Sequence, residues 1–259
     1  MKLRRRAVVD EVASDPSYLG ACTICGHEGM FGISPDRLPV DREFRCGACG
    51  YPLRFQDEAQ VLVDEFGDGR QLSLAGLLSS GRLLSQSVYH IGSQGPVRNR
   101  LRVLPGYQES RFEPDTALGS TLADGFRNED VERLTFSDSS FDLVVSSHVL
   151  EHVPDPWAAF AEFRRVLRPR GRMIHSIPSR FPFPDATIAR AEMDDGKVVH
   201  HLAAQYHKSP EGVPALVFTD FGADVCERLA SLGFEAVVRR PHLPVAEARR
   251  NAVIVARRA

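Results

Sequence analysis

Four of the five cysteines in the chain have the spacing of a metal site. They form the pairs CTIC (Cys22 and Cys25) and CGAC (Cys46 and Cys49), with 20 residues between the pairs. This spacing is typical of a zinc ribbon, in which two tight turns bring four thiolates to one tetrahedral ion. Four thiolates leave no open coordination position. We therefore expect a structural Zn²⁺ that supplies much of the folding free energy of this small segment.

Two other uses of these cysteines are disfavoured. Disulfides require an oxidising compartment, and nothing else in the sequence points to secretion. A redox-active pair would need a thioredoxin-like context, which the flanking sequence lacks. The fifth cysteine, Cys226, lies in the helical pattern DVCERLASLGF, and we interpret it as a small core residue.

Three histidines are candidates for acid–base chemistry. His148 and His152 lie four residues apart in SSHVLEHV, and His207 lies in QYHKSP. An imidazole titrates near neutral pH, so each could accept a proton from a hydroxyl group. The same spacing can place two metal ligands on one helix face, but no acidic third ligand is evident at a supporting spacing, and we expect no metal there. The structural alternatives are that His152 braces a loop and that residues 206–207 form a surface hairpin.

These groups must be positioned by alternating strands and helices. The apolar and β-branched runs predict strands at residues 87–92, 106–112, 141–147, 172–178, 234–240 and 251–258, and a short third strand near 125–128. Helical spacing predicts helices at 97–104, 155–171 and 221–233. In the second of these, Asp155 is the expected N-cap and Gly171 the expected end. The alternation predicts an α/β fold with a mostly parallel, doubly wound sheet covered on both faces.

The same patterns divide the chain into segments. We expect an N-terminal tail (1–20), the zinc ribbon (21–55), a helical bridge (56–86) and an α/β domain (87–259). Residues 178–219 interrupt the alternation with a stretch rich in proline, histidine and aromatic residues. Such a segment is too long for an ordinary loop, and insertions of this kind are often functional.

The segment SVYHIGSQGPVRN (87–99) has the outline of a nucleotide-binding turn. A short apolar run is followed by Gly92 and Gly95 and then by the start of a helix. Taken alone this signal is weak, and GSQG does not give the G-x-G-x-x-G turn of nicotinamide dehydrogenases.

A longer series of motifs gives the segment its context. The run EDVERLTFSDSSFDLVVSSHVLEHV begins at Glu129 and is followed by a helical pattern that ends in VLRPRG. Several blocks in this order closely resemble the class I S-adenosylmethionine-dependent methyltransferases, over roughly residues 87–178. The likeness continues, less closely, through QYHKSPEG and the last helix and strand. A zinc ribbon ahead of such a domain is also met in this superfamily.

The resemblance implies a Rossmann-like fold that binds S-adenosylmethionine at the carboxyl ends of its strands. It implies that Asp130 accepts a hydrogen bond from the adenine amino group; a turn cap is the alternative role. The other expected cofactor-binding residues are His90, Gly92, Gly95, Glu109, Ser147 and His148. The implied reaction is methyl transfer to an oxygen or nitrogen of a small-molecule or sugar acceptor, with His148, His152 or His207 as the base.

The sequence departs from the family pattern at several positions. His90 replaces the usual acid of the first motif, and the second of its three glycines is missing. The acid that normally takes the ribose hydroxyls is replaced by Arg111 in our alignment, and RPGG has become RPRG at Arg170. The alternative function is therefore a catalytically degenerate protein that uses the fold as a binding or scaffolding module.

Composition limits the remaining function classes. The chain has 259 residues and a formal net charge of -2, so no overall basic field favours nucleic acid as a partner. No apolar run approaches the length of a membrane span. Lys2 and Arg4 to Arg6 are not followed by the apolar stretch of a signal peptide. We expect a cytoplasmic protein whose partner is a small-molecule or glycan acceptor; the sequence does not predict an oligomeric state.

Overall fold

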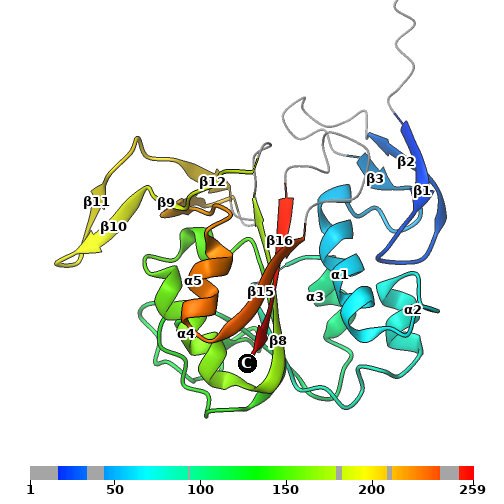
Figure 1. Ribbon diagram of the computed structural model, residues 1–259, viewed down its shortest axis with the longest axis horizontal. Coiled ribbons are helices and arrows are strands. Elements are labelled where there is room, and N and C mark those ends of the chain that lie inside the picture. Colours follow the sequence, from blue (N-terminus) through cyan, green and yellow to red (C-terminus); the bar gives the residue numbers. More distant parts are fainter. Residues whose placement is uncertain (1–16, 34–43, 93, 179–182, 209–211, 240–250) are drawn as a thin grey trace, which may run out of the picture.

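A computed structural model describes residues 17–33, 44–92, 94–178, 183–208, 212–239 and 251–259. Its centre is a seven-stranded sheet in the order β15-β16-β8-β7-β4-β5-β6 (Figure 1). The strands are β4 (Val88–Ile91), β5 (Tyr107–Arg111), β6 (Arg127–Asn128), β7 (Phe141–Ser147), β8 (Leu167–Pro178), β15 (Phe234–Arg239) and β16 (Asn251–Arg258). Strands β4 to β8 pair in parallel, whereas β16 is antiparallel to both of its neighbours.

The strand order reverses beside β4. The chain runs outward from β4 to β5 and β6, and then returns to place β7 on the other side of β4. In doubly wound sheets, ligands bind at the carboxyl ends of the strands next to such a reversal. The predicted fold class, α/β with a Rossmann-like, doubly wound and mostly parallel sheet, is confirmed.

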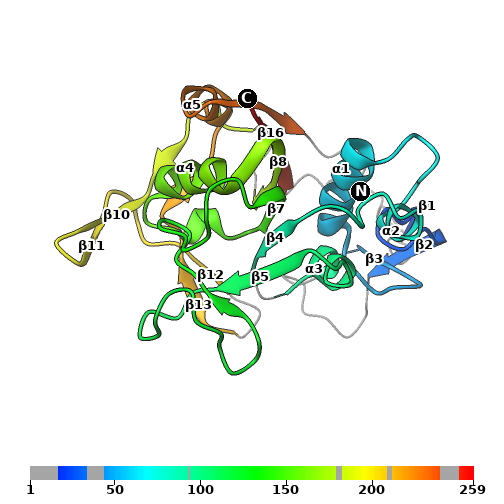
Figure 2. The ribbon, with the colours of Figure 1, turned by 90° about the horizontal axis from the view of Figure 1, so that it is seen from below.

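Helices cover both faces of the sheet (Figures 1 and 2). On one side lie α1 (Gln56–Phe66), α2 (Leu74–Ser79) and α3 (Pro96–Leu101), and on the other lie α4 (Pro156–Val166) and α5 (Val225–Ser231). The strands serve two cores because successive side chains point to opposite faces. Val88 packs with the first group of helices, and the adjacent Tyr89 packs with α4 and α5.

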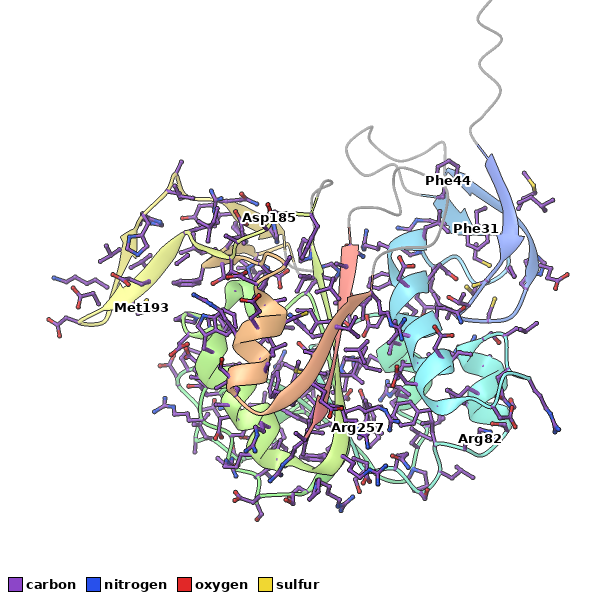
Figure 3. All side chains as sticks on the ribbon, in the orientation of Figure 1. Phe31, Phe44, Arg82, Asp185, Met193 and Arg257 are labelled. Carbon is purple, nitrogen blue, oxygen red and sulfur yellow. The ribbon has the colours of Figure 1, made fainter. Side chains whose placement is uncertain are left out.

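The N-terminal segment forms a small antiparallel sheet of β1 (Ser17–Ala21), β2 (Glu28–Ile33) and β3 (Phe44–Cys46). Phe31 and Phe44, labelled in Figure 3, belong to the same hydrophobic cluster as Val88 and Leu143 of the large sheet. The amide of Leu74, at the start of α2, also donates to the carbonyl oxygen of Thr23 at 2.7 Å. The ribbon and the bridge helices therefore share one continuous core with the α/β sheet; the segment boundaries remain predictions.

Helix α4 ends earlier than the sequence indicated. Asp155 caps it as expected and accepts hydrogen bonds from the amides of Trp157 and Ala158. The helix stops at Val166, however, and the following residues already belong to β8 instead of continuing to Gly171. The reason is Pro169, because a residue before proline is pushed out of the helical region and proline donates no backbone hydrogen bond.

The interruption after β8 folds into short strands. They are β9 (Ile188–Ala189), β10 (Ala191–Asp194), β11 (Lys197–His200), β12 (Tyr206–Lys208), β13 (Pro214–Leu216) and β14 (Thr219–Asp220). The hairpin of β10 and β11 projects from the molecule, with Met193 on it (Figure 3), and β12 and β13 form the hairpin expected around residues 206–207. Within the described ranges, no helix is both long and apolar enough to cross a membrane.

Candidate functional site

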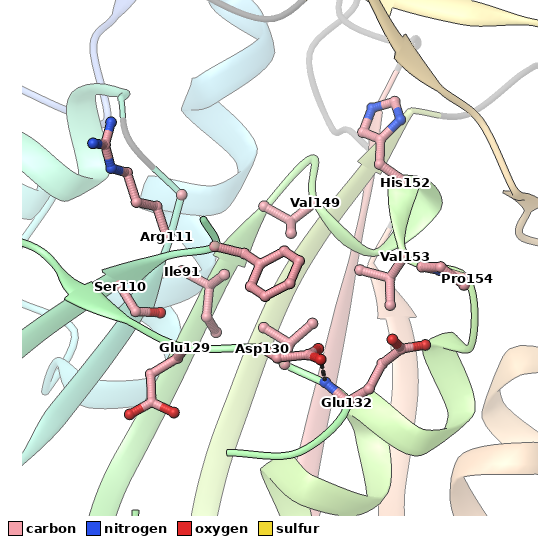
Figure 4. A pocket seen from close by; sticks show the side chains of 13 residues that line it. Ile91, Ser110, Arg111, Glu129, Asp130, Glu132, Val149, His152, Val153 and Pro154 are labelled. Atoms are coloured by element: carbon pink, nitrogen blue, oxygen red, sulfur yellow. Dashed lines mark hydrogen bonds between the residues drawn. The ribbon is translucent and has the colours of Figure 1, made fainter. Parts of the chain in front are cut away.

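A cavity of about 450 Å³ opens at the carboxyl ends of β4, β5 and β6 (Figure 4). It lies beside the reversal in strand order, where a doubly wound sheet is expected to bind a ligand. The loop after β7 closes its other side. The cavity is lined by Ile91, Gly92, Ser110, Arg111, Phe112, Glu129, Asp130, Val131, Glu132, Val149, His152, Val153 and Pro154. Of the predicted site residues, Gly92, Asp130 and His152 are thus brought together here.

The turn after β4 uses its two glycines for conformation. Gly92 has φ +116° and Gly95 has φ +129°, values that residues with a Cβ rarely adopt. A Cβ at position 92 would lie 3.6 Å from Val149, so the turn runs close to the loop after β7. Gly95 immediately precedes Pro96, the first residue of α3, and does not line the cavity.

His90 is buried beneath this turn. Its side chain is 1% exposed, and neither ring nitrogen has a hydrogen-bond partner among the described residues. Burial lowers the pKa of His90 to about 4, although the nearby charge of Glu109 opposes this shift. The imidazole is therefore neutral at physiological pH, and it does not reach the cavity.

Asp130 occupies a position compatible with both roles considered for it. Its carboxylate accepts hydrogen bonds from the Glu132 amide at 3.0 Å and from Arg133 at 2.9 Å, which caps the turn after β6. The same residue lines the cavity, and Figure 4 shows its carboxylate bonded to the amide of Glu132. A carboxylate oxygen has more than one lone pair, so capping a turn does not prevent it from accepting a further hydrogen bond.

The structure does not bring Glu109 to the cavity. Both of its carboxylate oxygens accept from Arg98 at 2.7 Å, and one also accepts from the Tyr107 hydroxyl at 2.9 Å. These bonds outweigh burial and lower the pKa of Glu109. The residue at the end of β5 is Arg111, which pairs with Glu113 at 2.5 Å and Asp124 at 3.3 Å.

Sequence reasoning missed two cavity residues that could contact a ligand. Phe112 follows β5 and is 51% exposed, which leaves an aromatic surface at the cavity. Glu132 lies two residues after Asp130, and burial raises its pKa. An aromatic residue at the last position of the predicted strand 106–112 was an available signal for Phe112, whereas Glu132 had no distinctive signal.

Ser147 bonds to the bridge helix instead of lining the cavity. Its hydroxyl lies 2.6 and 2.8 Å from the two carboxylate oxygens of Glu58 in α1, and the Ser176 hydroxyl donates to the same carboxylate at 3.1 Å. Glu58 is 1% exposed, and burial raises its pKa. The predicted cofactor contact of Ser147 is therefore replaced, in this structure, by a link between α1 and the end of β7.

The three candidate histidines gather around one carboxylate. Oε1 of Glu151 lies 3.7 Å from Nδ1 of His148, 3.7 Å from Nε2 of His152 and 3.9 Å from Nδ1 of His207. His148 and His152 flank Glu151 after β7, where η3 spans Leu150–His152, and His207 comes from β12. Burial alone would raise the pKa of Glu151, but the histidines around it lower that pKa. Burial also lowers the pKa of His207.

The four N-terminal cysteines converge as the sequence predicted. Their sulfur atoms lie within 4.8 Å of one another, with 3.7 Å between Cys22 and Cys49 and 3.8 Å between Cys25 and Cys46. A tetrahedral Zn²⁺ with Zn–S bonds of about 2.3 Å requires sulfur separations of about 3.8 Å. The side-chain amide of Gln56 also donates a hydrogen bond to the Cys22 sulfur at 3.4 Å. The donor set and its spacing therefore fit a closed tetrahedral site.

Known proteins match part of this chain. Residues 113–175 match the methyltransferase domain family. The chain is 41% identical over 66 residues to an uncharacterized 37.1 kDa protein in transposon TN4556 of Streptomyces fradiae, covering 24% of this chain and 19% of that protein. It is 41% identical over 63 residues to the ubiquinone biosynthesis O-methyltransferase of Cereibacter sphaeroides, covering 24% of this chain and 26% of that enzyme. The matches thus span about a quarter or less of these relatives' length.

The fold also resembles a solved structure. The glycopeptide N-methyltransferase MtfA, solved in complex with S-adenosylmethionine, aligns with a TM-score of 0.49 and 16% identity, over 87% of this chain and 100% of that chain. The family match covers strands β7 and most of β8, which flank the observed cavity-closing loop. The resemblance to methyltransferases that the sequence indicated is confirmed over residues 113–175, the part that matches the methyltransferase domain family.

Proposed function

We propose that this protein transfers a methyl group from S-adenosylmethionine to an oxygen or nitrogen of a small-molecule or sugar acceptor. The observation that carries the proposal is the cavity at the reversal in strand order. Gly92, directly after β4, and Asp130, after β6, both line it. The matched domain adjoins this cavity. The O- and N-methyltransferases among the similar proteins are compatible with either acceptor atom.

The cavity residues suit the parts of this cofactor. Asp130 would accept a hydrogen bond from the adenine amino group, and Phe112 would offer its exposed ring to the adenosine. Gly92 has no side chain, which leaves room for the methionine part of the cofactor beside Val149. When bound, S-adenosylmethionine supplies an activated methyl group, so the protein has mainly to hold the acceptor in line with it.

A hydroxyl or ammonium acceptor must lose a proton during the transfer. The cluster of His148, His152 and His207 lies at the rim of the cavity, where His152 contributes to the lining. Because burial lowers the pKa of His207, this imidazole is unprotonated at neutral pH and able to accept a proton. We assign the role of general base to this cluster.

We also propose that Cys22, Cys25, Cys46 and Cys49 hold a structural Zn²⁺. The proposal rests on the sulfur separations of 3.7 and 3.8 Å and on the absence of any open ligand position in a four-thiolate set. Its contribution would be to stabilise the ribbon and, through the shared core, the helices that cover the sheet.

Calorimetric titration of the full chain with S-adenosylmethionine tests the cofactor assignment. We expect one binding site per chain and an affinity about 10-fold lower for Asp130→Ala, which is the loss of roughly one hydrogen bond. Asp194→Ala, at an exposed position of β10, is the matched control and should bind as the unaltered chain does. No binding at millimolar cofactor to zinc-loaded protein would contradict the proposal.

A degenerate binding module is the second candidate, and specific contacts favour it. Glu109 is held by Arg98, Arg111 stands at the end of β5, and Ser147 is engaged by Glu58. Incubation with radiolabelled cofactor and panels of phenolic, amine and sugar acceptors separates the two candidates. Release of S-adenosylhomocysteine that depends on an acceptor supports the enzyme, whereas cofactor binding without turnover on any panel supports the module.

A further inference from the structure

We infer that Glu151, His152 and His207 form a second metal site, which takes a divalent ion of the borderline class such as Zn²⁺ or Co²⁺. This site is separate from the cysteine cluster, and it supplies the acidic ligand that the spacing of His148 and His152 alone did not reveal. One ligand atom from each of the three residues lies within 4.8 Å of the others. Two imidazoles and one carboxylate are a ligand set that binds such ions in proteins.

The distances between the three ligand atoms are slightly longer than those around a bound ion. Oε1 of Glu151 lies 3.7 Å from Nε2 of His152 and 3.9 Å from Nδ1 of His207. Both separations are too long for hydrogen bonds. Ligand atoms about 2.1 Å from a tetrahedral ion lie about 3.4 Å apart, so side-chain shifts of under about an ångström would complete the coordination.

The carboxylate of Glu151 is buried without a hydrogen bond among the described residues, and its other titratable neighbour is Nδ1 of His148 at 3.7 Å. The Glu151 side chain is 2% exposed, and neither oxygen accepts a hydrogen bond from any residue in the part of the chain that is described. A buried carboxylate without hydrogen bonds is costly, and a cation is one of the few groups that offset this cost. The buried carboxylate lies next to the imidazoles of His152 and His207, and it is therefore available as a metal ligand.

The tautomer of His152 is fixed in the form that a metal needs. Its Nδ1 lies 2.8 Å from the carbonyl oxygen of Leu216, which can only accept, so Nδ1 carries a proton and Nε2 is the nitrogen that has a lone pair in the neutral ring. Nε2 lies 3.7 Å from Oε1 of Glu151. Histidine ligands in metal sites commonly donate their second nitrogen to a backbone carbonyl in this way.

The insertion brings His207 to the other two ligands through backbone contacts. Leu216, the acceptor from His152, pairs with Tyr206 across the β12–β13 hairpin. The amide of Phe218 donates to the carbonyl oxygen of Glu151 at 2.7 Å. The rings of His152 and His207 lie 5.0 Å apart, centroid to centroid. The three ligands are thus positioned before an ion arrives.

The site is open where the cysteine site is closed. Three protein ligands leave at least one coordination position, and the side chains of His152 and His207 are 20% and 33% exposed. Because His152 lines the cavity (Figure 4), an acceptor oxygen there could take that position, and the ion would polarise it. This role rests on the proposed methyl transfer, whereas ion binding does not. While the ion is bound, His152 and His207 cannot also accept a proton, so the general base of the cluster is then His148.

Titration with Co²⁺ of the full chain loaded with a single equivalent of zinc, enough for the cysteine site alone, tests the second site, with visible absorption as the readout. We expect one equivalent of Co²⁺ to bind, without the sulfur-to-metal absorption that would mark Co²⁺ in the cysteine site. His207→Ala and Glu151→Gln should each weaken binding at least about 100-fold, since even outer-sphere partners change affinity by about 10–100-fold. His201→Ala is the matched control, because His201 faces Glu192 at 3.5 Å on the exposed hairpin.

Two results would overturn the inference. One is the absence of Co²⁺ binding at millimolar concentration to the unaltered chain. The other is unchanged binding by His207→Ala, a partly exposed position whose variant is expected to fold even where Glu151→Gln does not. The absorption readout requires no turnover, and cofactor titration of the same samples shows separately whether the proposed function fails.

Discussion

The two proposed metal sites of this protein are built in opposite ways. The cysteines come from two short turns of one small sheet, and their four sulfurs leave no free coordination position. Glu151, His152 and His207 come from a loop and a hairpin more than 50 residues apart, and one of them, His152, lines the cavity. A site of four thiolates has no free coordination position and can only stabilise the fold. A site of three mixed ligands keeps one position free for a reacting group.

Helix α1 connects the two regions. At its first residue, the side chain of Gln56 accepts from the Thr23 amide at 2.7 Å and donates to the Cys22 sulfur at 3.4 Å. Two residues later, Glu58 accepts from Ser147 at the end of β7, directly before His148. A change in the ribbon is therefore expected to reach the histidine cluster, and this link can be tested.

The largest effect is expected from breaking the closed cluster. Cys46→Ser removes one of four thiolates, and structural zinc contributes on the order of 10 kcal/mol to such small segments. We expect loss of zinc and a severe fall in the melting temperature, measured by metal analysis and thermal unfolding. Cys226→Ser, in α5 and outside the cluster, should retain zinc and melt close to the unaltered chain. Retention of zinc by Cys46→Ser would refute the assignment.

Acid should lower the free energy of unfolding through two buried histidines, His90 and His175. Burial lowers the pKa of both His90 and His175 to about 4, from about 6.5 in an unfolded chain. The unfolded chain therefore takes up protons first, and the free energy of unfolding falls as the pH drops from about 6.5 to 4. Each histidine accounts for roughly 3 kcal/mol of this loss.

Urea unfolding at pH 7.0, 5.5 and 4.5 measures this dependence. His90→Leu should flatten the curve, since it removes a group that must stay neutral in the folded state. His200→Leu, at an exposed position of β11, serves as the control and should keep the original slope. Identical slopes for all three proteins would show that His90 titrates normally.

A smaller effect is expected from cutting the link between the regions. Glu58→Ala leaves the hydroxyls of Ser147 and Ser176 without their acceptor and should cost about 2–4 kcal/mol. Glu58→Gln keeps an acceptor and removes the cost of a buried carboxylate whose pKa is raised, so its stability should match or exceed that of the unaltered chain at pH 7.

Chemical unfolding gives these two stabilities, and Co²⁺ titration of the same variants reports on the open cluster. Glu65→Ala, at the far end of α1 and paired with Arg172 at 3.0 Å on a partly exposed surface, is the matched control for loss of an acid from this helix. If Glu58→Ala proves as mild as Glu65→Ala, α1 does not couple the regions as described.

Much of the fold could be predicted because it follows from local patterns. The run FDLVVSS predicted β7 with its observed bounds, and Asp155 and Pro156 predicted the start of α4. The end of α4 was predicted too late because the apolar spacing continues past Val166, and the effect of Pro169 on Arg168 was given too little weight.

The cysteine cluster and the order of strands and helices could be predicted from local sequence. Both depend on spacings of a few residues, within which the chain has little freedom. Which polar side chains meet depends instead on the packing of the whole molecule. It places Glu58 against Ser147 across 89 residues, turns Glu109 to Arg98, and brings His207 to Glu151. Such contacts depend on how distant elements pack, and no local spacing encodes that packing.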